Sequence, residues 1–330
     1  MHFIGCDVSK LTLDLAGCDP QKGSRTRTCT VNNDRTGWHQ LTHWLEQGWP
    51  GDRSQIGVVM EATGVYHNGV AQYLHAAGFK VLVCNPGRAT DYARSQNRLN
   101  KTDGLDARSL QRYGARLEQI HWFEPHRPEI DQLKALLSLL WQLEKDIRRW
   151  TNRQEKAGFE PAGMTVRSPI ARQIRNLKRE RDRTQAAIDD LIAGSEALAR
   201  DQQLMCSIQG IGPKTSQSLL PLLHNSRFAS ARQAAAFIGL TPCHRQSGTS
   251  LNAPGRLSGR GDPRLRAKLY LPALTALKWN PELKAFYASL INRGKSPKQA
   301  ITAVMRKLVH LCYGVVKNQT PYQADYGCLP

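Results

Sequence analysis

Two aspartates three positions apart are the first residues of this sequence whose types and spacing suggest chemistry. In the stretch NKTDGLDAR, Thr102 can cap a helix that begins at Asp103. Asp103 and Asp106 then project from one helix face, with Cβ atoms about 5–6 Å apart. Carboxylates at that separation repel by about 4 kcal/mol at an effective dielectric of about 20, so a cation is expected between them. A hard divalent ion is the sharpest choice; Lys101, Arg108 or a plain solvated helix face are the alternatives.

Two further carboxylates lie at the ends of short apolar runs. Asp7 is near the end of HFIGCDV (2–8), and Glu61 closes IGVVME (56–61), and both runs predict buried strands. Taken singly, Asp7 reads as a turn residue at a strand end and Glu61 as a surface glutamate. Together with the aspartate pair of the helix, they favour four carboxylates that converge on a metal site.

The order of the expected elements would bring these carboxylates together. The sequence predicts three strands, a helix, a strand, a helix and a strand, followed by helices. This is the layout of the α/β ribonuclease H-like (RuvC-like) fold, with a leading meander that βα units extend. There Asp7 lies on the central strand, Glu61 on its neighbour, and the aspartate helix packs across the same edge. The expected strands are 2–8, 11–16, 27–31, 56–61 and 80–84. One expected helix is capped by residue 34 and a second covers 65–77, and a turn at 85–87 ends the last strand.

The charge balance points to a polyanionic partner. The 330 residues include 46 Lys and Arg against 27 Asp and Glu, a net charge of +19, which favours nucleic acid. No run approaches the roughly 20 apolar residues of a membrane span, and residues 1–6 resemble neither a signal peptide nor a myristoylation site. The eight cysteines are scattered without a CxxC motif. They are expected to be reduced core residues of a cytoplasmic bacterial protein, not zinc ligands or disulfides.

The middle of the chain predicts a helical arm. Apolar residues repeat at alternating spacings of three and four over 133–150 and again over 170–191, which is typical of a coiled coil. Prolines and glycines interrupt the pattern over 158–169. Residues 145–183 carry 12 Lys or Arg against 5 Asp or Glu, so phosphate contact is an alternative to a solvated helix face. The expected domains are a catalytic domain over 1–124, a coiled-coil linker arm over 125–200 and a mainly α-helical domain over 201–330.

Two motifs of the C-terminal part suit contact with nucleic acid. The turn Gly210-Ile211-Gly212-Pro213-Lys214 is typical of a helix-hairpin-helix, which offers backbone N–H groups and a lysine to a phosphate, although such glycines also make plain helical corners. The stretch 244–264 holds four glycines and two prolines and predicts a flexible basic loop that can bring a phosphate to a serine. Its alternative is a disordered surface loop. Amphipathic helices are expected over 263–278, 281–292 and 297–317.

The sequence resembles, nearly end to end, the DEDD transposases of the bridge-RNA-guided insertion-sequence family, which also includes the Piv-type DNA invertases. GCDVSK around Asp7 is similar to the first acidic motif of that family, EATG from Glu61 to the second, and NKTDGLDA to the third and fourth. In the C-terminal part the similar motifs are the Gly210–Gly212 hairpin, GLTP at 239–242 and Ser247-Gly248.

The resemblance implies an enzyme that excises and inserts DNA with a RuvC-like domain, a coiled-coil arm and a serine-bearing domain. One or two Mg²⁺, or Mn²⁺ in their place, are expected on Asp7, Glu61, Asp103 and Asp106. Ser247 would become linked to a DNA 5′ phosphate, with the serine and the acids supplied by different protomers of a dimer or tetramer. A structured non-coding RNA would select the double-stranded donor and target DNA at the nucleoid. Nucleic-acid contacts are expected from Lys10, Lys101, Gly210, Gly212, Lys214, Arg245, Arg256 and Arg260.

Two other functions compete with this one. A RuvC-like junction nuclease would use metal-activated water as the nucleophile, which leaves Ser247 and the second domain without a role. A catalytically silent nucleic-acid-binding protein would present four carboxylates to a polyanion, which repels it. The recombinase is therefore the favoured interpretation.

Overall fold

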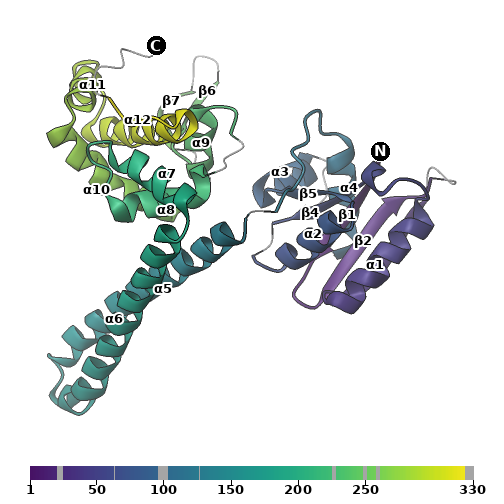
Figure 1. Ribbon diagram of the computed structural model, residues 1–330, viewed down its shortest axis with the longest axis horizontal. Helices are drawn as coiled ribbons and strands as arrows, with labels where there is room; N and C mark the ends of the chain where they lie inside the picture. The colour runs from purple at the N-terminus through teal and green to yellow at the C-terminus, as the bar shows by residue number, and fades with distance from the viewer. Residues whose placement is uncertain are drawn as a thin grey trace. The chain divides into compact units, whose positions relative to one another are not determined.

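The computed structural model describes residues 1–20, 25–62, 64–95, 103–125, 127–224, 228–247, 251–257 and 261–323 (Figure 1). Of residues 103–105, 161, 244–247 and 251–256 it describes the backbone alone. The chain divides into two compact units, Met1–His126 and Arg127–Pro330. Across these described ranges, no helix combines the length and the apolar character needed to cross a bilayer.

The first unit is built on a five-stranded mixed sheet. Its strands are β1 (His2–Val8), β2 (Thr12–Cys18), β3 (Thr26–Asn32), β4 (Ile56–Glu61) and β5 (Lys80–Cys84). They lie in the order β3-β2-β1-β4-β5, with β1, β2 and β3 antiparallel and β4 and β5 parallel to β1. The predicted order of strands and helices is confirmed. Because helices cover both faces, β1 and β4 read as nearly unbroken apolar runs.

In the described part of this unit, four helices cover the sheet: α1 (Arg35–Gly48), α2 (His67–Ala76), α3 (Pro86–Ser95) and α4 (Asp103–Ala115). Helices α1 and α2 pack on the face that presents Ile4 and Cys6, and α3 and α4 pack on the face that presents Phe3 (Figure 1). Asp34 caps α1 as expected, and its side chain accepts the N–H of Gly37 at 2.8 Å.

Helix α3 corrects one expectation, because the sequence predicts only a turn at 85–87. The side chain of Asn85 accepts the N–H of Gly87 at 2.9 Å, and its backbone carbonyl accepts those of Arg88 and Ala89 at 3.0 and 3.1 Å. Pro86 occupies the first helical position. Asn-Pro-Gly thus starts a helix here, since an asparagine cap followed by proline suits a helix N-terminus as well as a turn.

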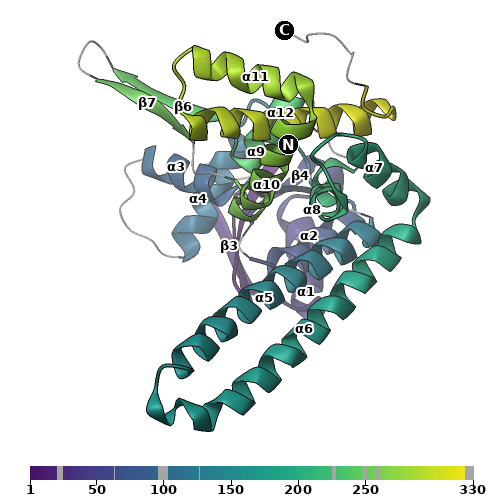
Figure 2. The same ribbon diagram turned by 90° about the vertical axis from the view of Figure 1, so that its left-hand side faces the viewer.

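The second unit begins with a long helical hairpin. It pairs α5 (Pro128–Ala157) with α6 (Met164–Ala193), each of 30 residues, through the short 3₁₀ turn Pro161–Gly163. This pair, called the arm below, runs antiparallel (Figure 2). The predicted break is shorter than expected, because α6 starts before Pro169 and includes it.

A bundle of shorter helices completes this unit: α7 (Glu196–Cys206), α8 (Pro213–Leu223), α9 (Ala231–Ile238), α10 (Pro263–Trp279), α11 (Pro281–Asn292) and α12 (Pro297–Asn318). The last three lie within one residue of their expected bounds. Buried Val304 and Leu308 of α12 share one core with Leu133 and Ile188 from the base of the arm. The arm is therefore anchored in the bundle by apolar packing.

Between α9 and α10 the structure has a β-hairpin where the sequence predicts a flexible loop. Strand β6 (Pro242–Ser247) pairs antiparallel with β7 (Leu251–Leu257), with a register shift between Cys243 and Arg245. Both strands of a two-stranded ribbon are edge strands. Pro254 lacks a backbone N–H, and β7 tolerates it because no third strand needs that N–H for pairing. The hairpin projects from the helices of its unit (Figure 2).

Candidate active site and nucleic-acid interface

The carboxylates predicted on β1 and β4 lie at the same level of the sheet. Cys6 pairs with Met60 in the parallel β1–β4 ladder, and Asp7 and Glu61 each follow these residues by one position. Neighbouring strands are about 4.8 Å apart, and successive side chains alternate between the faces. Asp7 and Glu61 therefore project from one face, opposite the face on which Cys6 is buried.

Helix α4 crosses this face in direct contact with β1. A Cβ added to Gly5 would overlap the carbonyl oxygen of Ala107, so the close approach of α4 requires glycine. At the other end of the helix, a Cβ on Gly114 would lie 3.0 Å from the ring of Phe3. Helix α4 thus runs antiparallel to β1, and its N-terminal part lies toward the end of β1 that carries Asp7.

The two aspartates of α4 belong to this N-terminal part. Asp106 directly precedes Ala107 and is half-buried, and Asp103 is the first residue of the helix. The side chain of Asp103, the expected cap Thr102 and Lys101 lie outside the described residues. Among the side chains that the structure does describe, no three His, Cys, Asp or Glu could hold a metal ion. The elements of the four predicted carboxylates meet, and the assembled cluster stays a prediction.

Two buried thiols respond to the negative charge of this region. Burial raises the pKa of Cys84 to about 12, and the Glu61 carboxylate adds to the rise. Burial also raises the pKa of Cys6, and the charges of Asp7 and Asp14 act in the same direction. Both thiols therefore stay protonated at neutral pH, and the carboxylates supply the negative charge of the site.

Asp14 is an acidic neighbour that the sequence pattern does not single out. It lies directly opposite Asp7 in the antiparallel β1–β2 pair, so both side chains point to the face that α4 crosses. Its Oδ1 accepts a hydrogen bond from the Thr30 hydroxyl at 2.6 Å. The alternation of β2 marks Asp14 as a polar position, but only the strand register places it beside Asp7.

Asn33 connects the loops that follow the two acidic strands. Its side-chain amide donates to the carbonyl of Ser9 at 2.9 Å and to that of Tyr66 at 3.2 Å, and its Oδ1 accepts from the Trp38 indole at 3.0 Å. The turn after β1, which carries the exposed Lys10, is thereby tied to the loop after β4. The partners Ser9 and Tyr66 are 24 and 33 positions away, so no local pattern reveals this role.

The glycine turn between α7 and α8 has two different glycine roles. Gly210 has a φ of 106°, and a Cβ there would lie 2.8 Å from the carbonyl oxygen of Pro272 in α10. Gly212 has open space around it and precedes α8, which no side chain caps. Lys214 is exposed in the first turn of α8. Gly210 therefore has a packing role, and the phosphate contacts expected from Gly210, Gly212 and Lys214 stay predictions.

The predicted serine lies on the β-hairpin of the second unit. Ser247 is the last residue of β6, and its backbone pairs with Leu251 of β7. Arg245 and Arg256 lie on opposite strands of this hairpin. Their side chains and that of Ser247 lie outside the described residues, as does the whole of Arg260. The serine and the acidic residues belong to different units of the chain.

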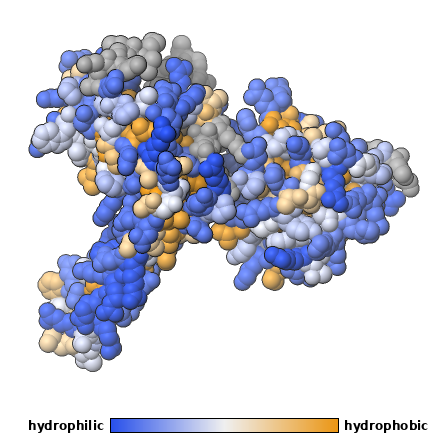
Figure 3. All heavy atoms as spheres, viewed as in Figure 1, coloured by the Kyte–Doolittle hydropathy of each residue, from blue (hydrophilic) through white to orange (hydrophobic). Residues whose placement is uncertain are grey.

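The arm presents a largely hydrophilic surface (Figure 3). Some of its arginines form local ion pairs, such as Arg149 with Asp146 at 3.3 Å. Arg148, Arg172 and Arg175 are exposed and form no ion pair with any residue that the structure describes. Their charge is therefore available to an external anion.

Two transposase family models match this chain. The model described as "Transposase", of the IS110 DEDD type, matches residues 4–157, and the model described as "Transposase IS116/IS110/IS902 family" matches residues 202–288. The pilin gene-inverting proteins of Moraxella bovis and Moraxella lacunata are each 31% identical over 322 residues, 97% of this chain and 97% of theirs. An uncharacterized 43.6 kDa protein of insertion element IS110 from Streptomyces coelicolor is 25% identical over 122 residues, 37% of this chain and 30% of that protein. The chain belongs to the IS110 family of DEDD transposases and recombinases.

Proposed function

We propose that this protein is a DNA transposase or recombinase that cuts and rejoins strands with a metal-dependent acidic site on a RuvC-like domain. The observation that carries the proposal is the meeting of three acidic elements. Asp7 and Glu61 share one level of the sheet, and α4 packs on the same face at Gly5 with Asp106 in its N-terminal part. A meander extended by parallel strands supports the ribonuclease H-like class.

The residues of this site fit a hard divalent cation. Carboxylate oxygens are the ligands that Mg²⁺ prefers, and Mn²⁺ accepts the same donors. Asp7, Glu61, Asp103 and Asp106 would hold one or two such ions. A bound ion would neutralise the charge that develops on the scissile phosphate. Carboxylates on adjacent strands at one level repel each other, and a cation between them would lower that repulsion.

Ser247 is the proposed nucleophile. Its Oγ attacks the phosphorus, a P–Oγ bond forms, and the bond from phosphorus to the 3′ oxygen breaks. The 3′-hydroxyl leaves with the proton that the serine gives up, and the 5′ phosphate stays on the protein. Because a phosphodiester is retained, the strands can rejoin without another energy source. The projecting hairpin supports access of this serine to a DNA backbone.

The proposed substrates are double-stranded donor and target DNA at the bacterial nucleoid, selected by a structured non-coding RNA. The net charge of +19 and the exposed arginines of the arm support contact with polyanions. The relatives named pilin gene-inverting proteins support DNA inversion as the class of reaction. A homodimer or tetramer would combine the acids of one protomer with the serine of another.

A trapped covalent adduct tests the serine step. A suicide substrate, from which the cut strand diffuses away, should leave DNA attached to the denatured protein. Ser247→Ala should lose both the adduct and recombination with the fold unchanged, whereas Ser168→Ala, at an exposed serine of the arm, should lose neither. Free 5′-phosphate ends without an adduct would identify water as the nucleophile, as in a junction nuclease. An adduct that survives Ser247→Ala would assign the step to another serine.

The acidic cluster and the RNA have separate tests. Asp7→Asn keeps the shape of the side chain and removes its charge, so it should abolish cleavage and leave DNA retention nearly intact. Cleavage by the unaltered protein should stop in chelator and return with Mg²⁺ or Mn²⁺. Undiminished cleavage in chelator would contradict the metal, and undiminished cleavage of cognate DNA after complete RNA removal would contradict guidance.

A further inference from the structure

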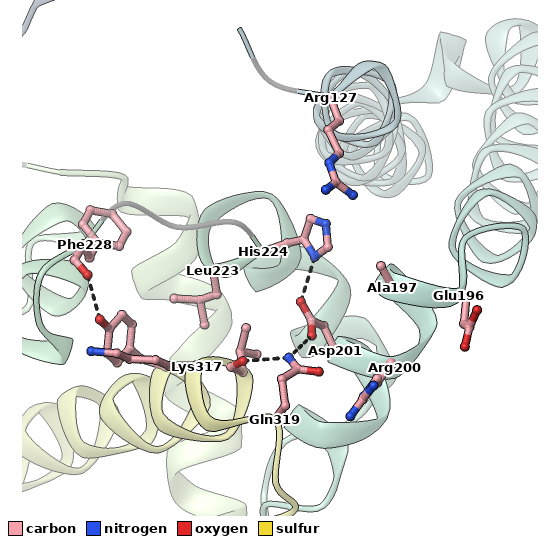
Figure 4. A pocket seen from close by; sticks show the side chains of 12 residues that line it. Arg127, Glu196, Ala197, Arg200, Asp201, Leu223, His224, Phe228, Lys317 and Gln319 are labelled. Atoms are coloured by element: carbon pink, nitrogen blue, oxygen red, sulfur yellow. Dashed lines mark hydrogen bonds and ion pairs between the residues drawn. The ribbon is translucent and has the colours of Figure 1, made fainter. Parts of the chain in front are cut away.

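A cavity of about 640 Å³ in the second unit lies apart from the serine hairpin. It is formed where α5 and α7 begin and where α8 and α12 end, and its lining includes Arg127, Asp201, His224 and Gln319 (Figure 4). The acidic residues and Ser247, which the proposed reaction uses, are not among its lining residues. The cavity is therefore lined by residues other than those proposed for strand cleavage.

A buried Asp–His pair forms the base of this cavity. The side chains of Asp201 and His224 are only 6% and 7% exposed, and His224 Nδ1 lies 2.7 Å from Asp201 Oδ2. The other carboxylate oxygen accepts a hydrogen bond from Gln319 Nε2 at 2.8 Å. Both oxygens of Asp201 are thus engaged, and the imidazole is held in one orientation.

The backbone of Gln319 is strained in a way that supports this arrangement. Among the described residues, it is the one residue other than glycine with a positive φ, at 54°. Its side chain also donates to the carbonyl of Val316 at 2.7 Å, which holds the end of α12 against Asp201. Left-handed backbone at a residue other than glycine persists where its surroundings fix it, and such positions concentrate at functional sites.

The free edge of the His224 ring faces the cavity. Because Nδ1 faces Asp201, Nε2 lies on the side toward the guanidinium of Arg127 (Figure 4). Among the described residues, the pair with Asp201 is the one hydrogen bond of the His224 side chain. With Nδ1 directed at Asp201, Nε2 is the ring nitrogen left to form a hydrogen bond with a ligand.

The charges around the pair are mostly positive. Arg127, Arg200 and Lys317 line the cavity and lie on different sides of the pair (Figure 4), and none forms an ion pair with a described residue. The ammonium of Lys317 lies over the Tyr313 ring, 5.6 Å from its centroid. Glu196 also lines the cavity, but it points away from His224 in Figure 4. Three basic side chains thus line the cavity against two acidic ones, Asp201 and Glu196, so its net charge favours anions.

We propose that this cavity binds the phosphate group of a nucleotide, either free or within a nucleic-acid strand. His224 presents Nε2 to the ligand, and Arg127, Arg200 and Lys317 supply the counter-charge. A volume of about 640 Å³ exceeds what a phosphate alone needs. The apolar side chains of Leu223 and Phe228 line the remaining part, where a sugar or base can pack.

Calorimetric titration of the full-length protein tests this site, with adenosine 5′-monophosphate and with an unstructured oligonucleotide as probes. Arg200→Gln and Lys317→Met change exposed residues, so both variants should stay folded. Each should weaken binding of the probe about 5- to 10-fold. Arg293→Gln and Lys284→Met are matched controls at exposed residues of the same unit outside the cavity, and they should bind as the unaltered protein does. His224→Asn should weaken binding further.

The two probes separate the sources of the phosphate. Saturable binding of the mononucleotide, weakened in the cavity variants, assigns the site to a free nucleotide. A variant-dependent loss seen with the oligonucleotide alone assigns it to a strand. Failure of both probes to bind, or equal affinities in the cavity variants and their controls, overturns the proposal. His224→Asn removes the imidazole partner of the buried Asp201 carboxylate and can unfold the protein. The variants Arg200→Gln and Lys317→Met therefore decide between these outcomes.

Discussion

At the scale of single residues, Asn33 links both acidic strands through one amide group. Asn33→Asp replaces the amide NH₂ group, which donates to the carbonyls of Ser9 and Tyr66, with an oxygen that cannot donate. The other side-chain oxygen still accepts from the Trp38 indole. Loss of such hydrogen bonds at a half-buried site costs about 1–2 kcal/mol. We expect the unfolding free energy to fall by that amount and the rate of strand cleavage to fall more than DNA affinity. Asn292→Asp, at an exposed site, makes the same charge change and should alter neither.

His310 gives the protein a stability that depends on pH with a definite sign. Burial, followed by Arg306, Lys307 and Arg232, lowers its pKa from 6.5 to about 4. Its Nε2 has no hydrogen-bond partner among the described residues. Between pH 4 and 6.5 His310 is protonated in the unfolded chain and neutral in the folded chain. The contribution of His310 to the unfolding free energy is therefore complete above pH 6.5 and is lost as the pH falls toward 4. In denaturant titrations, His310→Gln should weaken the dependence of the unfolding free energy on pH between 4 and 6.5. Equal pH dependence in the two proteins would show that another group is responsible.

At the scale of elements, the two glycines of the α7–α8 turn differ in how closely other atoms surround them. Gly210→Ala would place a Cβ 2.8 Å from the carbonyl oxygen of Pro272 at a positive φ, which stores about 1–3 kcal/mol of strain. Thermal unfolding should show a loss of that size. Gly212→Ala meets no atom within 4 Å, so its stability should change by less than about 0.5 kcal/mol. Equal losses in the two variants would contradict this difference in packing.

Which elements the sequence predicts depends on where their stability comes from. Strands β1, β4 and β5 have the bounds that the sequence predicts. Because both faces of these strands are buried, each is an apolar run with polar residues at its ends. The hairpin β6–β7 has no such apolar run, because its strands contain basic residues, glycine and proline. Backbone pairing between the two strands forms this hairpin. Helix α3 is missed because Asn85-Pro86-Gly87 fits a turn and a helix start equally well.

The candidate site is predictable in its residue types and less so in its surroundings. Asp7 and Glu61 follow from strand ends, which a local pattern reveals. Asp14 and Asn33 depend on strand register and on hydrogen bonds to distant segments, and neither leaves a local signal. Gly5 reads as an ordinary strand residue until the contact with α4 shows why a side chain cannot fit there.

At the scale of the whole molecule, the excess of positive charge predicts a steep salt dependence of nucleic-acid binding. If roughly eight phosphates are neutralised, log K should fall against log salt with a slope of about −7. Changing Arg148, Arg172 and Arg175 of the arm to glutamine should reduce the steepness by up to about 3. Changing Lys284, Arg293 and Lys295 to glutamine removes the same charge from exposed sites outside the arm and should leave the slope unchanged. A flat titration of the unaltered protein would assign the charge to solubility.

The division of the proposed chemistry between two units makes a prediction for mixed oligomers. Asp7→Asn disables the acids of the first unit, and Ser247→Ala disables the serine of the second. If one protomer supplies the acids and another the serine, a dimer with one copy of each variant has one site with both defects and one site with none. Each variant alone should be inactive, and the mixture should regain recombination, measured on the same donor and target DNA. If each protomer supplies both groups, every site keeps one defect, and no mixing ratio restores activity. A third protein with both substitutions, mixed with either variant, should stay inactive in both cases, so recovery in the first mixture would require intact sites built from two chains.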